Sequence, residues 1–135
     1  MARVDPAAVW SLHYRLTMSV ILEIAPEVAA LGLEIKELFV LAEIDAHPYP
    51  AELADTLCMP KPTVTTNLKR LEAAGFVRRE IDPSDLRRHR LLLTPAGRRA
   101  MTRGVGVIAE AFGARLARLG AAQQAELQTL LERLA

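Results

Sequence analysis

The chain has 135 residues, enough for one domain of ordinary size, and its formal net charge is only +1. Hydrophobic residues make up 51% of it, yet no apolar run reaches membrane-spanning length, and residues 1–6 lack the basic start and apolar core of a secretory signal. The single cysteine, Cys58, excludes an intramolecular disulfide and a cysteine metal cluster within one chain. We therefore expect a cytoplasmic protein with one domain and no membrane partner.

The first predicted helix begins at Asp5-Pro6, where Asp caps the helix and Pro occupies its first position, and it extends to about Ala25. Pro26 is expected to kink or end it. On this helix, Trp10, His13 and Tyr14 share one face through i, i+3 and i+4 spacing. The cationic Arg15 follows Tyr14 directly. A second helix is predicted over Glu34 to Ala46.

Two short helices follow, and together they predict a helix-turn-helix. The first, Pro50 to Leu57, places Leu53, Ala54 and Leu57 on one face. The link Cys58-Met59-Pro60 has the length of the turn in a helix-turn-helix, whose second helix enters the major groove. A helical hairpin without a DNA-binding role remains an alternative for these two helices alone, because solvated helix faces are common.

The second of these helices, Lys61 to Ala74, has an apolar face and a polar face. Val64, Leu68 and Leu71 recur at i, i+4 and i+7 and predict the buried face. Pro62 suits the first turn, and Gly75 suits a left-handed helix end. The polar face of this helix is predicted to reach base edges and phosphates. The predicted DNA-binding residues are Lys61, Pro62, Thr63, Thr65, Thr66, Asn67, Lys69 and Arg70.

Two strands are predicted after Gly75, over Phe76 to Ile81 and His89 to Leu93. The intervening segment, Asp82 to Arg88, is rich in turn formers and predicts a charged hairpin tip. An arginine at such a tip is attracted by the negative potential of a narrow minor groove. Asp85 is expected to hold Arg87 by a charge-assisted hydrogen bond. Arg88 and Arg90 complete the predicted DNA contacts, and His89 is either a phosphate contact or an exposed strand residue.

Residues 33 to 99 resemble the DNA-binding domain of MarR-type bacterial transcription regulators. The resemblance lies in "PTVTTNLKRLEAAGFVRRE" and "DPSDLRRHRLLLTPAGR". It implies that Asp85 and Arg87 mark the wing, and that Leu93, Thr94 and Gly97 close the second strand. The sequence departs from the family pattern at Leu86, where a basic residue is frequent, and at Thr66 and Asn67, where an arginine and an apolar residue are frequent. These departures bear on which DNA sequence is bound.

The resemblance also implies a fold class, mainly α with a small β-hairpin wing: a winged helix-turn-helix, here residues 33–94, plus a helical dimerisation region, residues 1–32 and 95–135. The C-terminal helices are predicted from Thr94-Pro95 to about Leu119 and from Ala121 to Leu134. Their apolar residues exceed what one domain of this size can hide. We expect a homodimer, double-stranded DNA as partner, and a pseudo-palindromic operator with half-sites about 34 to 36 Å apart.

The charge distribution favours nucleic-acid binding. Residues 60–103 hold 11 Lys or Arg against four acids, or +7, and the remainder holds 6 against 12, or −6. A basic middle between acidic ends favours phosphate binding on one face. The predicted function is a sequence-specific transcription regulator, and we expect a repressor because a dimer on its operator blocks polymerase. The alternative is a winged-helix module whose basic face binds RNA or a protein.

The sequence holds no phosphate loop, nucleophile elbow or HExxH pattern, so we expect neither catalysis nor a cofactor. His13, His47 and His89 are scattered, and no metal site is expected. The family resemblance implies a small aromatic or anionic effector. Trp10, His13, Tyr14 and Arg15 are candidate contacts for it, and the alternative is that they lie in the dimer interface. Cys58 is either a small hydrophobe or a thiol whose oxidation disturbs DNA binding.

Overall fold

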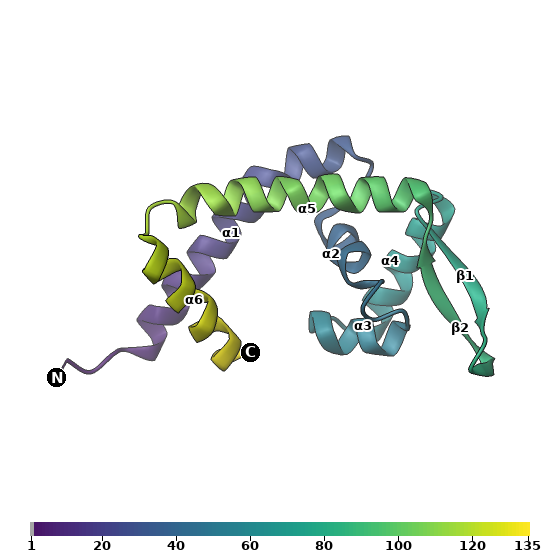
Figure 1. Cartoon of the computed structure of the whole chain (residues 1–135), viewed down its shortest axis with the longest axis horizontal. Helices are drawn as coiled ribbons and strands as arrows, with labels where there is room; N and C mark the ends of the chain where they lie inside the picture. Colours follow the sequence, from purple (N-terminus) through teal and green to yellow (C-terminus); the bar gives the residue numbers. More distant parts are fainter. Residues whose placement is uncertain (1) are drawn as a thin grey trace. The chain divides into compact units, whose positions relative to one another are not determined.

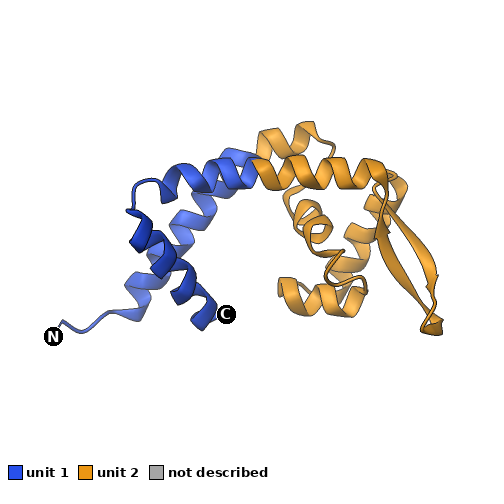
Figure 2. Ribbon diagram, in the orientation of Figure 1, with its two compact units in different colours: residues 1–24, 107–135 blue, residues 25–106 orange. Residues whose placement is uncertain are grey.

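A computed structural model describes residues 2–135. The chain divides into two compact units, unit 1 with residues 1–24 and 107–135 and unit 2 with residues 25–106 (Figure 2). The elements in chain order are α1 (Pro6–Ala30), α2 (Ile35–Glu43), α3 (Pro50–Leu57), α4 (Lys61–Ala73), β1 (Val77–Asp82), β2 (Asp85–Leu93), α5 (Pro95–Leu116) and α6 (Ala121–Leu134) (Figure 1). The predicted fold class, mainly helical with one hairpin, is confirmed.

Unit 2 contains the helix-turn-helix and the hairpin. Helices α2, α3 and α4 contact one another, and β1 contacts the end of α4. The core of this unit consists of completely buried aliphatic side chains, among them Leu38, Leu41, Leu53, Leu68 and Leu71. Because α4 has its apolar residues on one face, burying that face leaves the opposite face exposed. The predicted buried residues of α4 are confirmed.

Sequence signals locate several helix ends correctly. The backbone N–H of Ala7 donates to Asp5 Oδ1 at 3.0 Å, which is the predicted cap of α1. The N–H of Gly97 donates to Thr94 Oγ1 at 3.0 Å, which is the predicted cap of α5. Gly75 has a φ of +79°, the left-handed conformation expected after α4.

Helix α1 continues through Pro26 to Ala30, beyond its predicted end. Proline removes one backbone hydrogen bond, which usually costs about 3 kcal/mol inside a helix. Ile24 and Val28 on either side of Pro26 are both buried. Burial of this face stabilises the helix across the proline. The ends of α2 at Glu43 and α5 at Leu116 come earlier than predicted, because turns take over there.

The hairpin has a longer second strand and a shorter turn than predicted. Strands β1 and β2 are antiparallel, with Glu80 opposite Arg90 and Ile81 opposite His89, and the register shifts at Asp82. Residues 85–88 belong to β2, so the prediction of a turn from Asp82 to Arg88 is wrong and the tip is Pro83-Ser84. The charged residues 85–88 are typical of a turn in the sequence, and the pairing that makes them part of a strand comes from β1 on the other side of the hairpin.

Gly97 makes a close approach between the start of α5 and the turn after α4. A Cβ atom at this position would overlap the backbone carbonyl oxygen of Phe76. The same carbonyl accepts a hydrogen bond from the N–H of Thr94 at 3.1 Å, and Thr94 Oγ1 donates to the carbonyl of Gly75 at 2.6 Å. The first turn of α5 is therefore joined to the end of the helix-turn-helix through backbone atoms and the Thr94 hydroxyl.

Unit 1 is formed by most of α1, the second half of α5 and α6. It leaves large apolar side chains exposed on α1 and α6, including Val9, Leu12, Leu22, Leu130 and Leu131. Helix α6 has no buried residue, and all of it lies in the described part of the chain. Within residues 2–135, no single helix is long and apolar enough to cross a membrane; the pair α1 and α2 meets the length and composition criteria only when taken together, across a bend.

Candidate nucleic-acid interface

The outward face of α4 carries small polar and basic side chains. Thr65 and Thr66 lie in its middle, with Lys61 before them and Lys69 after them, and all four are exposed. Pro62 is also exposed, and Thr63 is half-buried. Short side chains between two ammonium groups allow the backbone of a helix to approach base edges while the charges contact phosphates.

Asn67 does not belong to this face. It is only 5% exposed and lies on the side of Val64, Leu68 and Leu71, so its predicted place on the outward face is wrong, and its burial argues against the predicted DNA contact. Positions 64, 67, 68 and 71 follow the i, i+3, i+4, i+7 spacing of a buried helix face, and the polar side chain concealed that pattern. Among residues 2–135, its Nδ2 atom finds no hydrogen-bond partner.

The hydroxyl groups of the two central threonines are oriented by the helix itself. Thr65 Oγ1 donates to the carbonyl of Lys61, and Thr66 Oγ1 donates to the carbonyl of Pro62, each at 3.0 Å. With their hydrogens directed at the backbone, both oxygens present lone pairs outward. They are therefore suited to accept hydrogen bonds from a ligand.

Arg70 is held by the helix that precedes the helix-turn-helix. Its Nη1 lies 2.7 Å from Glu34 Oε1, and its Nε lies 3.8 Å from the buried Glu37. The hydrogen bond with Glu34 raises the pKa of the guanidinium, with Glu37 adding to the effect. Arg70 thus links α4 to the start of α2, and its predicted DNA contact stays a prediction.

Arg87 projects from the hairpin. Its side chain is 92% exposed, and its Nε donates to Asp85 Oδ1 at 3.3 Å. The same oxygen accepts the backbone N–H of Arg87 at 3.0 Å. The predicted hydrogen bond between these two residues is present. It orients the arginine from the strand itself and leaves its guanidinium accessible.

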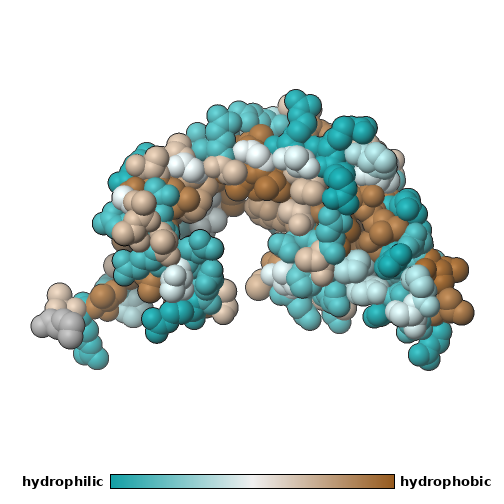
Figure 3. Space-filling model, in the orientation of Figure 1, coloured by the Kyte–Doolittle hydropathy of each residue, from teal (hydrophilic) through white to brown (hydrophobic). Residues whose placement is uncertain are grey.

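Apolar side chains flank this arginine on the hairpin. Leu86 is 78% exposed and Ile81 is 57% exposed. Figure 3 shows hydrophobic residues, in brown, on one part of the hairpin beside hydrophilic ones. Leu86 stands next to the outward Arg87 and carries no charge. The hairpin therefore has one cation fewer for phosphate contacts than it would have with a basic residue at this position.

The other two arginines predicted to bind DNA have acidic partners on the hairpin. Arg90 Nε donates to Glu80 Oε1 at 2.7 Å, and this contact lowers the pKa of Glu80 and raises that of Arg90. Arg88 Nε donates to Asp82 Oδ2 at 3.0 Å. Asp82 also accepts a hydrogen bond from the hydroxyl of Tyr49. Sequence reasoning missed Tyr49 and Asp82 because 33 residues separate them.

The candidate effector residues lie together on α1 in unit 1. The Trp10 ring stacks on that of His13 with 6.0 Å between centroids, and it lies 6.4 Å from the Tyr14 ring. Arg15 Nε donates to the carbonyl of Ser11 at 3.4 Å. Trp10 and Tyr14 are more than half exposed, so this surface is available to a ligand or to a second chain.

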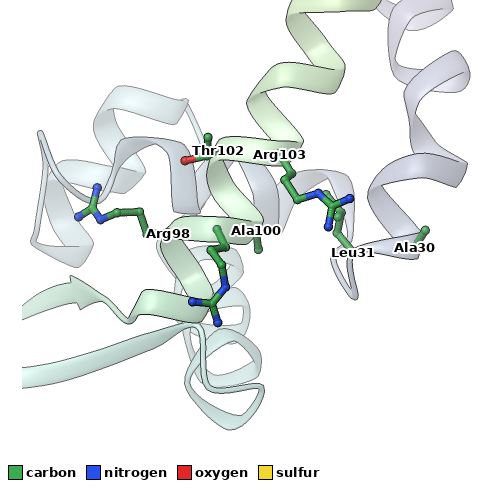
Figure 4. Close-up of a pocket in the computed structure, with 7 residues that line it drawn as sticks. Ala30, Leu31, Arg98, Ala100, Thr102 and Arg103 are labelled. Carbon is green, nitrogen blue, oxygen red and sulfur yellow. The ribbon is translucent and has the colours of Figure 1, made fainter.

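Unit 2 has a separate cavity of about 510 Å³ between the end of α1 and the start of α5. It is lined by Ala30, Leu31, Arg98, Arg99, Ala100, Thr102 and Arg103. Figure 4 shows the Arg103 side chain extending toward Leu31 and the Arg98 side chain directed away from it. Arg98 pairs with Asp45 at 2.9 Å. The cavity therefore combines a cationic wall with an apolar one.

Comparison with known proteins identifies the family. A family model described as MarR family matches residues 31–88. The HTH-type transcriptional repressor Rv2887 of Mycobacterium tuberculosis is 33% identical over 136 residues, which cover 99% of this chain and 98% of the repressor. The chain belongs to the MarR family. The resemblance inferred from the α4 and hairpin motifs is thereby confirmed.

Solved structures support the same assignment for this MarR-family chain. Rv2887 in complex with DNA has a TM-score of 0.73 and 30% identity, covering 98% of this chain and 99% of that one. Rv2887 in complex with salicylic acid has a TM-score of 0.76 and 32% identity, covering 100% of both chains. Members of the MarR family regulate transcription, and this chain shares their fold along its whole length.

Proposed function

We propose that this MarR-family chain is a homodimeric, sequence-specific DNA-binding repressor whose α4 enters the major groove and whose Arg87 enters the minor groove. The observation that carries the proposal is the exposed face of α4, with Lys61, Thr65, Thr66 and Lys69, in one compact unit with a hairpin whose Arg87 is 92% exposed. A relative that matches 98% of this chain, Rv2887, has been crystallised with DNA. Repression is proposed because the curated relatives are named repressors.

The orientation of the threonine hydroxyls specifies the kind of base contact. Because Thr65 and Thr66 donate to the backbone of α4, their oxygens would accept from a base. In the major groove, the donors are the amino groups of adenine and cytosine. We therefore propose that these threonines select for A or C, while Lys61 and Lys69 contact phosphates without regard to sequence.

Dimerisation is supported by the apolar surface of unit 1. Exposed aliphatic residues on α1 and α6 would be covered by a second copy, as in the dimers of this family. A groove lined by Phe112, Leu116, Leu127 and Leu131 lies between α5 and α6 within this unit. Two-fold symmetry would then place two copies of α4 in successive major grooves, about 34 to 36 Å apart.

Release by a small aromatic carboxylate is the regulation that we propose. One relative, Rv2887, has been crystallised with salicylic acid and with p-aminosalicylic acid. Two places on this chain offer a cation beside apolar surface: the α1 face with Trp10 and Arg15, and the cavity with Leu31 and Arg103. An effector lowers operator affinity only if it binds the DNA-free geometry more tightly.

Selection of bound duplexes from a random library, at moderate salt, tests the DNA-binding proposal. We expect a pseudo-palindrome with half-sites about one helical turn apart. Recovery of no motif from purified, effector-free dimer would refute sequence-specific binding and favour an RNA or protein partner for the basic face. We propose that this regulator has no catalytic activity. We also propose that it is located in the cytoplasm, together with the DNA that it binds.

Titration of salicylate into the complex with the selected duplex tests the effector proposal. We expect the fluorescence anisotropy of labelled DNA to fall as salicylate rises. Arg103→Ala and Arg15→Ala distinguish the two places, because loss of the response in only one of them identifies the cation that holds the carboxylate. An anisotropy that stays constant up to millimolar salicylate would refute release by this class of compound.

A further inference from the structure

A buried carboxylate joins the hairpin to the segment before α3. Asp82, at the end of β1, is only 2% exposed. Its Oδ2 accepts from the Tyr49 hydroxyl and from Arg88 Nε, the latter at 3.0 Å. Its Oδ1 accepts from the backbone N–H of Ser84 at 2.9 Å and from the Ser84 hydroxyl at 2.7 Å. Both oxygens of this carboxylate are therefore satisfied by donors from three parts of unit 2.

Arg88 and Tyr49 also contact each other directly. The guanidinium carbon of Arg88 lies over the Tyr49 ring, 3.9 Å from its centroid, a cation–π arrangement. The backbone adds another link nearby, because the N–H of Leu91 donates to the carbonyl of Pro48 at 2.8 Å. Pro48 and Tyr49 are thus linked to the hairpin in three ways: by a backbone hydrogen bond, by the Asp82 carboxylate and by the stacked Arg88 guanidinium.

The charge state of this cluster is fixed around neutral pH. The hydrogen bond from Tyr49, followed by those from Ser84, holds the pKa of Asp82 well below its usual range. The hydrogen bond to Asp82 in turn raises the pKa of Tyr49. A permanently ionised carboxylate facing a permanently charged guanidinium keeps the contact in place throughout the pH range of a living cell.

We propose that Tyr49, Asp82 and Arg88 form a wing clamp, which sets the position of the hairpin relative to α3, and that Arg88 acts on DNA binding as a positioning residue. This inference rests on the proposed function. Successive side chains of a strand point to opposite faces. With Arg88 facing Tyr49, Arg87 is directed to the other face, where it is available to a minor groove. Tyr49, which lies outside the hairpin and outside α4, becomes a determinant of operator affinity.

The test combines three variants with two measurements. Tyr49→Phe removes one hydroxyl and no charge, Arg88→Lys keeps the charge without the planar guanidinium, and Arg88→Ala removes both. Amide hydrogen exchange of residues 77–93 is measured on the dimer without DNA. The affinity for the selected duplex is measured at several salt concentrations, because each lost phosphate contact reduces the salt slope by about 0.9. Arg78→Ala is the matched control, since Arg78 pairs with Glu80 on the same hairpin and does not touch the clamp.

If the wing clamp is correct, Tyr49→Phe and both Arg88 variants increase exchange in the hairpin on the order of fivefold, whereas Arg78→Ala leaves it unchanged. Tyr49→Phe weakens operator binding several-fold with the wild-type salt slope. Wild-type exchange in Tyr49→Phe would overturn the proposal. The proposal would also be overturned if Arg88→Lys bound the operator with wild-type affinity while Arg88→Ala showed a reduced salt slope. Those two results together would indicate that Arg88 contacts a phosphate.

The two measurements separate this inference from the proposed function. If the wild-type protein selects no DNA motif, the DNA-binding proposal fails, and hydrogen exchange still decides whether Tyr49 and Arg88 hold the hairpin. If the protein selects a motif and the exchange of residues 77–93 is unaffected by the variants, the repressor proposal stands and the wing clamp does not.

Discussion

Replacing Asn67 by leucine should stabilise the protein. Asn67 is 5% exposed on the buried face of α4, and within residues 2–135 its Nδ2 has no acceptor. A buried donor without a partner costs about 1 to 3 kcal/mol. Leucine is similar in size and has no polar atom, so the substitution removes that cost and adds apolar contact with the core of unit 2.

The net gain is expected to be about 1 to 2 kcal/mol, because the slightly larger side chain must be accommodated in a close-packed site. For a chain of this length, each kcal/mol shifts the melting temperature by roughly 3 to 5 °C. Asn67→Leu should therefore raise the Tm by about 3 to 10 °C at a fixed dimer concentration, which calorimetry measures.

Two controls make this prediction specific. Thr66→Leu adds the same side chain on the exposed face of α4 and should change stability by no more than about 0.5 kcal/mol. Operator affinity of Asn67→Leu should stay near that of the wild type, since a buried amide does not reach a base. A lower Tm together with altered base preference would refute the reasoning and return Asn67 to the DNA-contacting face.

Further predictions concern the hairpin, the packing of α5 and the dimer. Arg87→Ala should reduce the salt slope of operator binding by about 0.9 and weaken binding most where the minor groove is narrow; a loss confined to one base position would contradict this role. Leu86→Lys should increase the slope by a similar amount, measured by anisotropy at several salt concentrations. Gly97→Ala should lower the free energy of unfolding in urea by roughly 2 to 4 kcal/mol. Gly106→Ala should raise it by about 0.5 to 1 kcal/mol, because a Cβ there would meet no other part of the described chain within 4 Å beyond its own helix backbone; equal effects would show that the close approach at Gly97 is absent in solution. Leu116→Asp should convert the dimer to a monomer in sedimentation velocity, and an unchanged profile would exclude this part of α5 from the interface.

Acid should weaken the hairpin through its carboxylates. The pKa of Asp82 is lowered by hydrogen bonds from Tyr49 and Ser84, and that of Glu80 by Arg90. A lowered pKa in the folded state contributes stability that is present above the unfolded pKa and is lost as pH falls through the folded value. Hydrogen exchange of the hairpin should therefore lose protection below about pH 4, and less so in Asp82→Asn, which starts from lower protection.

Local signals in the sequence were sufficient for the elements whose ends are fixed by nearby residues. Asp5 and Thr94 cap their helices as expected, and Gly75 ends α4 in the left-handed conformation. The spacing of Val64, Leu68 and Leu71 correctly predicted the buried face of α4. In each case, the residues that determine the structure lie within two helical turns of one another.

The sequence was least informative in two cases. In one, a residue's type contradicts its position on the helix, and in the other, the residues that contact one another are distant in the sequence. Asn67 was assigned to the surface because it is polar, although its position follows the buried stripe. The predicted DNA contact of Arg88 stays a prediction, and no local pattern reveals that Tyr49 and Asp82 converge on it. The family motif names the residues of the wing but gives no information about which guanidinium is already paired.

The close approach at Gly97 limits how the DNA-binding region can be moved. The contact between Gly97 and the Phe76 carbonyl involves backbone atoms, which have no rotamer that could adjust, so the first turn of α5 is expected to move together with the end of the helix-turn-helix. Gly104, two turns later, also makes a close approach, in its case to the side chain of the buried Leu38. A bend that reorients α4 on its DNA is therefore not expected in the first turn of α5. A change of angle in α5 beyond that turn would move the end of the helix-turn-helix without first being absorbed by side-chain rearrangement at Gly97.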